Sequence, residues 1–120
     1  MSELQMGAVE GRFADILWSR EPITAAALAR LAEAELGWKK TTSYTVLKRL
    51  CDKGIFKNEG GLVTSLISKE EFYALQSERF VQETFAGSLP AFLAAFTARK
   101  ALTEEEILYL RRMIEEHKEE

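Results

Sequence analysis

The spacing of apolar residues along the chain predicts a succession of amphipathic helices with one short β-hairpin among them. An opening helix has its apolar side at Val9, Phe13, Ile16 and Leu17. Pro22 prevents this helix from continuing, and Thr24 offers its hydroxyl as the N-terminal cap of a second, Ala-rich helix. Gly37 ends that second helix, whose small apolar stripe consists of Leu28, Leu31 and Ala32.

Residues 37–54 predict a turn followed by an amphipathic helix with an unusual polar side. At about 100° per residue, an inward stripe forms on the Leu47 side from Ser43, Val46, Leu50 and Gly54. The opposite side gathers Thr41, Thr42, Thr45, Lys48, Arg49 and Asp52, with Tyr44 at its border. Asp52 is the only acid there, and hydroxyls, Arg and Lys are the groups that reach phosphates and base edges. We interpret this segment as a recognition helix, with an ordinary basic surface helix as the alternative.

Two short apolar runs after the basic helix predict a β-hairpin. Residues 55–58 and 62–67 flank the sequence Glu59-Gly60-Gly61, which has the composition of a turn. An Ala-rich helix joined by a short turn to a second helix is a helix-turn-helix arrangement. The chain is therefore expected to be mainly α, with a winged helix-turn-helix DNA-binding domain in residues 1–67. Its expected core consists of Phe13, Ile16, Leu17, Leu28, Leu31, Leu47 and Leu50.

Residues 68–120 predict three further helices with apolar sides. Two of them begin with the capping-box spacing, at Ser68 with Glu71 and at Thr103 with Glu106. The stripes of the last two helices are Leu89, Phe92, Leu93, Phe96, Ile107, Leu110 and Ile114. Five phenylalanines of the region have little else to cover them, namely Phe72, Phe80, Phe85, Phe92 and Phe96. We expect these helices to be the dimerisation region of a homodimer; folding back on their own winged domain is the alternative.

The charge is distributed unevenly. The whole chain of 120 residues carries a formal net charge of −3. Residues 39–57 hold six Lys or Arg and one Asp, a net charge of +5, whereas residues 68–120 hold seven Lys or Arg and eleven Glu, a net charge of −4. Binding to nucleic acid depends on the local field, so an acidic chain with a compact basic segment remains compatible with a double-stranded DNA partner.

Residue types that carry enzyme chemistry are scarce. The chain has one His, His117, and one Cys, Cys51, so we expect no catalytic residues, no metal and no cofactor. Cys51 is interpreted as a small core residue rather than a redox sensor. A single cysteine fits a reducing compartment, and residues 1–5 lack the pattern of a signal peptide. No run approaches the ~20 apolar residues that span a bilayer, so a cytoplasmic location without membrane insertion is expected.

The order and spacing of several short motifs resemble the penicillinase-repressor family of bacterial transcriptional regulators. These motifs are Ile16-Leu17-Trp18, Pro22-Ile23-Thr24, Gly37-Trp38, Thr42, Thr45, Arg49-Leu50, Lys53-Gly54, Phe85-Ala86-Gly87-Ser88 and Leu102-Thr103-Glu104-Glu105-Glu106-Ile107. The resemblance spans about residues 8–115. It implies a dimeric repressor of a resistance or homeostasis operon, with a winged helix that binds a palindromic DNA operator.

Candidate site residues come from the resemblance and from the helical pattern together. The resemblance places DNA contacts at Thr42, Thr45 and Arg49, with Trp38 just before the helix, where it either packs or contacts the DNA backbone. The pattern adds Lys40, Thr41, Tyr44 and Lys48. An alternative from another class is a winged-helix protein-interaction module, in which Trp38, Tyr44 and the basic side bind an acidic partner.

The resemblance also implies a route of release from DNA. Family members induced through a membrane-bound sensor protease are cut in the penultimate helix, just before a phenylalanine. The matching bond here is Ala95–Phe96, with Ala in the place of the family's better-known Asn. The copper-responsive branch has a cysteine-rich tail, and residues 113–120 contain no cysteine. Copper sensing of that type is therefore not expected.

Overall fold

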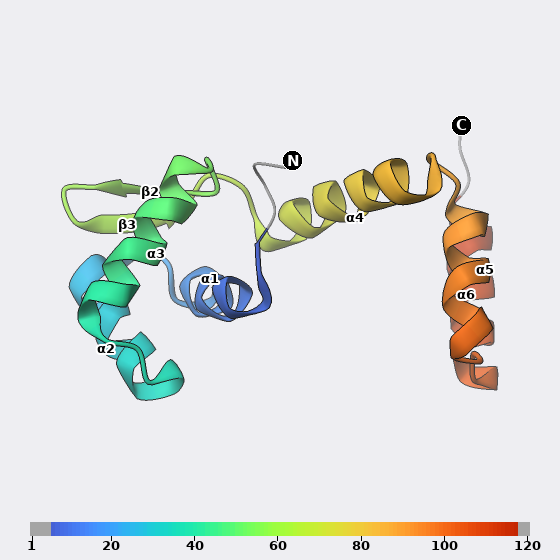
Figure 1. Cartoon of the computed structure of the whole chain (residues 1–120), viewed down its shortest axis with the longest axis horizontal. Helices are drawn as coiled ribbons and strands as arrows, with labels where there is room; N and C mark the ends of the chain where they lie inside the picture. The colour runs from blue at the N-terminus through green and yellow to red at the C-terminus, as the bar shows by residue number, and fades with distance from the viewer. Residues whose placement is uncertain (1–5, 118–120) are drawn as a thin grey trace. The chain divides into compact units, whose positions relative to one another are not determined.

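The computed structural model of the chain describes residues 6–117, which form six α-helices and one small antiparallel sheet (Figure 1). The elements in chain order are α1 (Ala8–Arg20), β1 (Ile23–Thr24), α2 (Ala25–Leu36), α3 (Lys40–Asp52), β2 (Phe56–Glu59), β3 (Leu62–Ser65), α4 (Lys69–Phe85), α5 (Leu89–Arg99) and α6 (Glu104–Glu116). The chain divides into two compact units, one that ends at Ser77 and one that begins at Glu78. The architecture confirms the mainly α class with a winged helix-turn-helix and further C-terminal helices.

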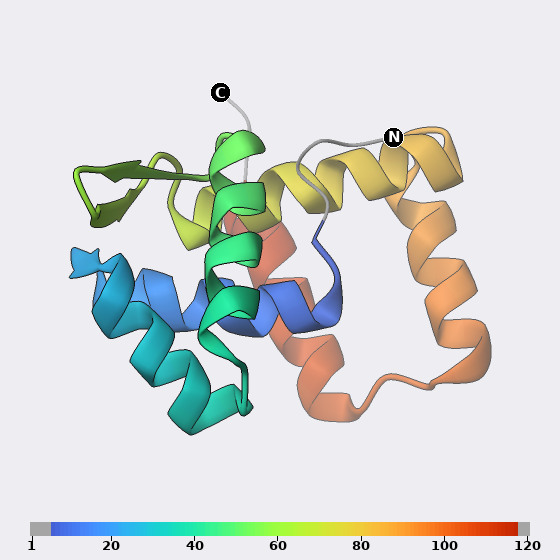
Figure 2. The same ribbon diagram turned by 60° about the vertical axis from the view of Figure 1, so that its left-hand side comes forward.

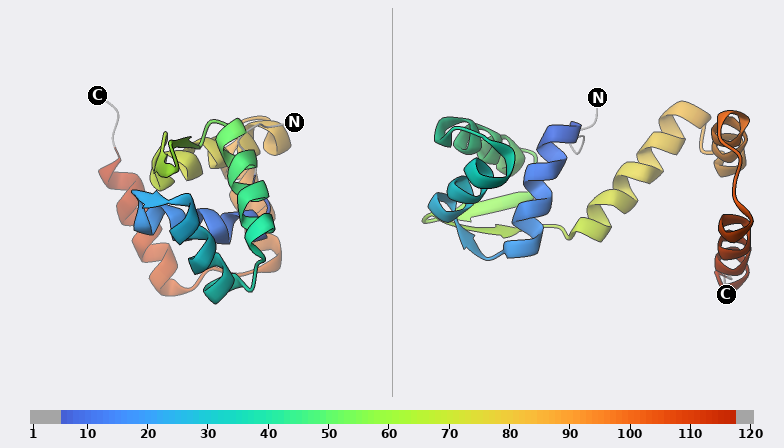
Figure 3. Two further views of the ribbon diagram at one scale, coloured as in Figure 1. Left: turned by 90° about the vertical axis from the view of Figure 1, so that its left-hand side faces the viewer. Right: turned by 90° about the horizontal axis from the view of Figure 1, so that it is seen from below.

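The second helix begins and ends where local chemistry predicts. The Thr24 hydroxyl accepts a hydrogen bond from the Ala27 amide at 3.1 Å and caps α2. Gly37 ends α2 in the left-handed conformation, with a φ of 71°, which a side chain would make costly. Small buried residues of α2, Ala29 and Ala32, let its neighbours approach closely. In the resulting packing, α3 crosses α1 steeply (Figures 2 and 3).

The sheet has the strand order β1-β3-β2, with both pairs antiparallel. Opposite each other lie Ile23 and Val63 in one pair, and Glu59 and Leu62 in the other. The hairpin turn therefore contains only Gly60 and Gly61, whose φ angles of 61° and 94° suit a two-residue turn of this kind. The sequence pattern placed Glu59 in the turn, which was wrong, and it did not predict β1, because a two-residue strand leaves no periodicity to detect.

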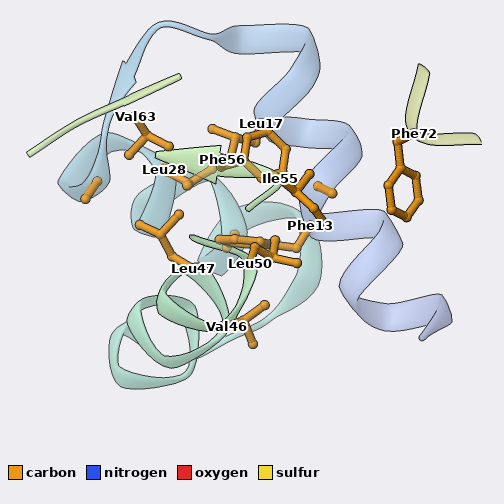
Figure 4. Close-up of a cluster of buried hydrophobic side chains, with 13 residues drawn as sticks. Phe13, Leu17, Leu28, Val46, Leu47, Leu50, Ile55, Phe56, Val63 and Phe72 are labelled. Carbon is orange, nitrogen blue, oxygen red and sulfur yellow. The ribbon is translucent and has the colours of Figure 1, made fainter. Parts of the chain in front are cut away.

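A single apolar core joins the helices and the hairpin of the first unit (Figure 4). Its largest fully buried side chains are Phe13, Leu17, Leu28, Leu50, Ile55, Phe56, Val63 and Phe72. The inward stripe of α3 is confirmed at Ser43, Val46, Leu47 and Leu50. Two predictions were wrong: Val9 is 55% exposed because it lies in the first turn of α1, and Gly54 is exposed because α3 ends at Asp52 before reaching it.

The first turns of α4 pack on this core. Phe72 is fully buried, with its ring 5.7 Å from that of Trp18, and the Trp18 indole donates a hydrogen bond to the Ile67 carbonyl at 3.1 Å. An ion pair between Lys69 and Asp15, at 3.2 Å, joins the same two helices. The expectation that Phe72 lacks cover was therefore wrong. Helical periodicity shows that a residue is apolar, but it does not show which neighbour covers it.

The second unit contains the end of α4 together with α5 and α6. The Ser88 hydroxyl caps α5 by accepting from the Ala91 amide at 3.1 Å. At the start of α6, Thr103 and Glu106 form the predicted capping box, with hydrogen bonds of 3.0 and 2.9 Å. Successive ring contacts, with centroids 5.7–6.2 Å apart, link Phe80, Phe85, Phe92 and Phe96. These rings remain accessible, and neither α5 nor α6 has a buried residue.

No helix within residues 6–117 combines the length and the apolar character that crossing a membrane requires.

Replacing Phe72 by Ala should destabilise the winged unit, although the residue lies in α4. We expect a loss of about 3–5 kcal/mol in the free energy of unfolding, as for other fully buried phenylalanines. Urea unfolding followed by tryptophan fluorescence measures it, because Trp18 contacts the Phe72 ring. Leu66→Ala, at an exposed apolar position, is the control and should cost less than about 1 kcal/mol. Equal losses in the two variants would contradict this packing.

Candidate nucleic-acid interface

The outer side of α3 presents the side chains that the helical pattern assigned to DNA. Seven of the eight predicted contacts are exposed, namely Lys40, Thr41, Thr42, Tyr44, Thr45, Lys48 and Arg49. All seven belong to α3. The inward stripe of this helix is anchored in the core by Val46, Leu47 and Leu50. Core packing therefore fixes which side of α3 faces outward, and this side is rich in hydroxyls and cations.

Trp38 is half-buried and packs inside the unit. Its ring stacks on that of Phe13, with centroids 5.1 Å apart and planes 17° from parallel. The Trp38 amide donates a hydrogen bond to the Ala32 carbonyl at 3.3 Å, which ties the turn to the end of α2. The structure contains the packing role considered from sequence, and a contact of Trp38 with DNA stays a prediction. Through this stacking, α1 positions the start of α3.

The start of α3 is rich in cations and has no acid of its own. Its first turn contains no acidic residue, and the Lys40 ammonium lies 5.9 Å from the centre of the Tyr44 ring. Lys40 also lines a recess of about 100 Å³ between α2 and α3, together with Arg30 and Glu33. Sequence reasoning did not include Arg30, because an exposed cation on an Ala-rich helix has no distinguishing pattern. Arg30 and Lys40 therefore face one recess together with Glu33, and Lys39 precedes Lys40 as the N-cap residue of α3.

Later in α3, each cation has a carboxylate partner. Lys48 pairs with Asp52 one turn further on, at 3.2 Å. Arg49 Nη1 donates to Glu10 Oε2 of α1 at 2.6 Å, and Lys53 Nζ lies 3.4 Å from Glu10 Oε1. The Lys48 pair is well exposed and contributes little to stability. The Glu10 cluster differs, because the Glu10 side chain is only 14% exposed.

The pKa of Glu10 is lowered below its ordinary value. Partial burial alone would raise this pKa, because it disfavours the charged form. The hydrogen bond from Arg49, the hydrogen bond from the Gly7 amide and the positive charge of Lys53 outweigh that effect. Glu10 is therefore a firmly ionised carboxylate beside the outer side of α3. Sequence reasoning missed it because periodicity does not show which acid of one helix reaches a cation of another.

The hairpin adds little positive charge to the interface. Its cation Lys57 pairs with Glu59 of the same strand at 3.5 Å. Leu62 and Leu66 are exposed beside it. One cation paired with one acid leaves this hairpin with little net positive field.

The residues expected to mediate dimerisation lie on accessible apolar sides of the second unit. Leu89, Phe96, Ile107 and Ile114 are exposed, whereas Phe92, Leu93 and Leu110 are half-buried. A groove of about 490 Å³ runs between α5 and α6, and its lining residues are Phe92, Leu93, Phe96, Leu102, Glu105, Glu106, Tyr109 and Leu110. The Ala95–Phe96 bond lies within α5. A protease would need this part of the helix to unfold before it could bind an extended strand.

Burial raises the pKa of the Cys51 thiol, and the neighbouring Asp52 adds to this effect against the opposing charge of Lys48. A half-buried thiol with a raised pKa is a poor nucleophile, which agrees with its interpretation as a packing residue. Within residues 6–117, no three His, Cys, Asp or Glu side chains are grouped so that they could hold a metal ion.

Comparison with known protein families matches residues 6–116 to the penicillinase repressor family, which covers both units. The chain belongs to this family. A penicillinase repressor from Bacillus licheniformis is 25% identical over 118 residues, which cover 95% of this chain and 92% of that protein. Family membership confirms the resemblance drawn from the motifs. As a member of this family, the chain is a transcriptional regulator and not an enzyme; it is called the repressor below.

Glu10→Gln should flatten the acid side of the repressor's stability curve. A carboxylate whose pKa is lowered by folding stabilises the folded state above its unfolded-state pKa, and this contribution disappears as the pH falls through the lowered value. Below about pH 5, the free energy of unfolding should therefore decline less in the variant than in the wild type. Urea unfolding across the acid range measures both slopes. Glu59→Gln on the wing is the control, and matching slopes for wild type and Glu10→Gln would contradict the clustering.

Proposed function

We propose that this repressor is a homodimer that binds a palindromic double-stranded DNA operator through the outer side of α3. The observation that carries the proposal is the exposed row of hydroxyls, aromatic ring and cations on a helix whose other side is anchored in the core. Such a row suits the major groove, where hydroxyls and guanidinium groups reach base edges and ammonium groups reach phosphates. Family membership supports the same role.

Each side chain of the row has a proposed part. Arg49 contacts a base edge, and its half-exposed guanidinium has the fork geometry that suits guanine. Lys40 and Lys48 contact phosphates as point charges. The remaining hydroxyl and aromatic groups complete the contacts in the groove, namely Thr41, Thr42, Tyr44 and Thr45, with Trp38 supporting the turn before them.

A second copy of the chain is the proposed cover for residues 68–120, apart from Phe72. The accessible phenylalanines and the apolar groove between α5 and α6 support this assignment. Two copies related by a two-fold axis present two α3 helices, which matches a palindromic operator with two half-sites.

Release is proposed to follow proteolysis of Ala95–Phe96 in α5, driven by a membrane-bound sensor protease pathway. The cut would divide the stripe formed by Leu89, Phe92, Leu93 and Phe96, and so remove shared apolar surface from the dimer. A cytoplasmic location and control of antibiotic resistance genes belong to the same proposal and rest on the family's name.

Selection from fragmented genomic DNA tests the DNA-binding proposal and identifies the operator. The repressor should retain fragments that share a palindrome, with affinity that falls steeply as salt rises, because phosphate contacts release counterions. Retention of no sequence above background would contradict operator binding, and binding to an acidic protein instead would support the interaction-module alternative.

Arg49→Ala should cost roughly 1–3 kcal/mol in operator binding while affecting scrambled DNA little, because a base contact carries sequence information. Lys48→Ala should weaken both kinds of DNA and reduce the salt slope by about one unit. Fluorescence anisotropy at several salt concentrations measures both. Arg79→Ala in α4 is the control, since this arginine pairs with Glu83 outside the interface. If Arg49→Ala and Lys48→Ala behave alike, the base-contact role of Arg49 is wrong.

Phe96→Ala should shift the repressor toward monomer. Phe96 is 46% exposed in the single chain. Its burial should contribute up to about 1.5–3 kcal/mol per copy to the free energy of dimerisation. Sedimentation velocity over a concentration series gives the dimer dissociation constant. Val9→Ala, exposed on α1, is the control and should leave that constant unchanged. A wild type that sediments as a monomer at micromolar concentration would rule out the proposed dimer.

Cutting at Ala95–Phe96 should abolish operator binding. An engineered protease site inserted at this bond allows the cut to be made in vitro, with the intact insertion variant as the control. Gel filtration and operator binding are then measured on the same sample. A cut protein that stays dimeric and keeps its operator affinity would show that the C-terminal helices do not govern release.

A further inference from the structure

Glu10 occupies a special position, because it is the acid through which α1 reaches the recognition side of α3. Its two oxygens divide their partners: Oε2 accepts from Arg49 Nη1 at 2.6 Å, while Oε1 accepts from the Gly7 amide at 3.3 Å and lies 3.4 Å from Lys53 Nζ. The carboxylate is therefore held by its own helix as well as by α3.

The carboxylate is also held rigidly. Glu10 lies one turn before Phe13 and Ala14, which are fully buried, so α1 cannot turn about its axis without disrupting the core. The Glu10 side chain is 14% exposed, whereas the Arg49 side chain is 52% exposed. A guanidinium has five N–H donors in a planar fork, and Glu10 engages it through Nη1. The half-exposed remainder of the fork is thus presented from a fixed anchor.

We propose that Glu10 is a positioning residue that holds Arg49 ready to contact a guanine edge in the operator, an inference that rests on the proposed function. A free arginine loses rotamer freedom when it binds a base, and that loss weakens recognition. Because Glu10 already restricts the rotamers of Arg49 in the unbound protein, less of this freedom is lost when the base is bound. A planar fork fixed at one nitrogen also keeps its orientation, which bidentate pairing with guanine requires.

The same carboxylate has an opposite effect on the attraction of DNA in general. Its negative charge lies beside Arg49 and Lys53 and reduces the positive field that phosphates experience. Through its charge, Glu10 therefore lowers the affinity for DNA of every sequence. Through its hold on Arg49, it raises the affinity for the operator relative to other sequences. Specificity is the difference between these two affinities, so Glu10 increases discrimination rather than affinity.

Glu10→Gln separates positioning from a merely structural role. The amide keeps the size of the side chain but loses the charge that holds the guanidinium. The affinity for a scrambled duplex should rise, and the ratio of operator to scrambled affinity should fall by about 2- to 10-fold, the range expected for releasing one long side chain. The probes are the duplex recovered by genomic selection and a scrambled duplex of equal length and composition. A structural role would lower both affinities together and leave their ratio unchanged.

Asp52→Asn is the matched control, because it removes a carboxylate from the same region without touching Arg49. It should raise the affinity for scrambled DNA but leave the ratio unchanged. In an Arg49→Ala background, Glu10→Gln should likewise leave the ratio unchanged. A ratio that falls equally with and without Arg49 would overturn the inference.

Glu10→Asp guards against a variant that fails to fold. It keeps the charge but shortens the side chain by one methylene, so the ratio should fall while the affinity for scrambled DNA stays near that of the wild type. An unchanged ratio in both folded variants would overturn the positioning role.

A measurement without DNA keeps this inference distinct from the proposed function. In the free repressor, the Arg49 Nε–H resonance should show the restricted motion of the backbone, and Glu10→Gln should make it mobile; Arg49→Ala assigns the signal. Equal mobility in wild type and variant would overturn positioning even if the operator is bound. If Arg49 is restrained but the wild type shows no sequence preference, the proposed function fails, and the inference about guanine recognition fails with it.

Discussion

The packing of α1 determines the geometry on which the rest of the winged unit depends. Phe13 lies in the core and stacks on Trp38, which precedes α3. One turn earlier, Glu10 holds Arg49, and five residues after Phe13 the Trp18 ring contacts the ring of Phe72 from α4. A single helix therefore fixes the start of α3, the side chain of its arginine and the first turns of α4. Loosening α1 would disturb all three together.

Sequence patterns predicted most elements because several helices, α2, α5 and α6 among them, have a start or stop signal that acts locally. Thr24, Gly37, Ser88 and Thr103 work within four residues, so one sequence suffices to place them. The exposed side of α3 was predictable for a similar reason, since 3.6-residue periodicity determines which residues share a side. The cover of Phe72 and the Glu10–Arg49 pair were not, because both depend on tertiary contacts between residues more than 38 positions apart.

The ion pairs of the winged unit reduce the positive electrostatic field around it, and this effect is more important here than their contribution to stability. Lys48, Arg49 and Lys57 each lie against a carboxylate, so the charge of +5 in residues 39–57 attracts distant phosphates less than its count indicates. The start of α3, with Lys39 and Lys40, has no acid in its first turn. In the proposed DNA complex, hydroxyls and an anchored arginine therefore carry a larger share of recognition than bulk charge does.

In the proposed operator complex, a winged unit whose positive field is moderated by ion pairs binds one half-site weakly, and this links the roles of the two units of the chain. In the proposed dimer, the second half-site is reached within one complex, so its effective concentration replaces the free concentration of repressor. Affinity for the operator then depends steeply on association through α5 and α6, whose apolar sides are accessible in the single chain. A device that only breaks the dimer can release the DNA without any change at α3. In this proposal, the moderated charge of the winged unit makes such a device sufficient, because a strongly basic monomer would stay on the DNA after the dimer had separated.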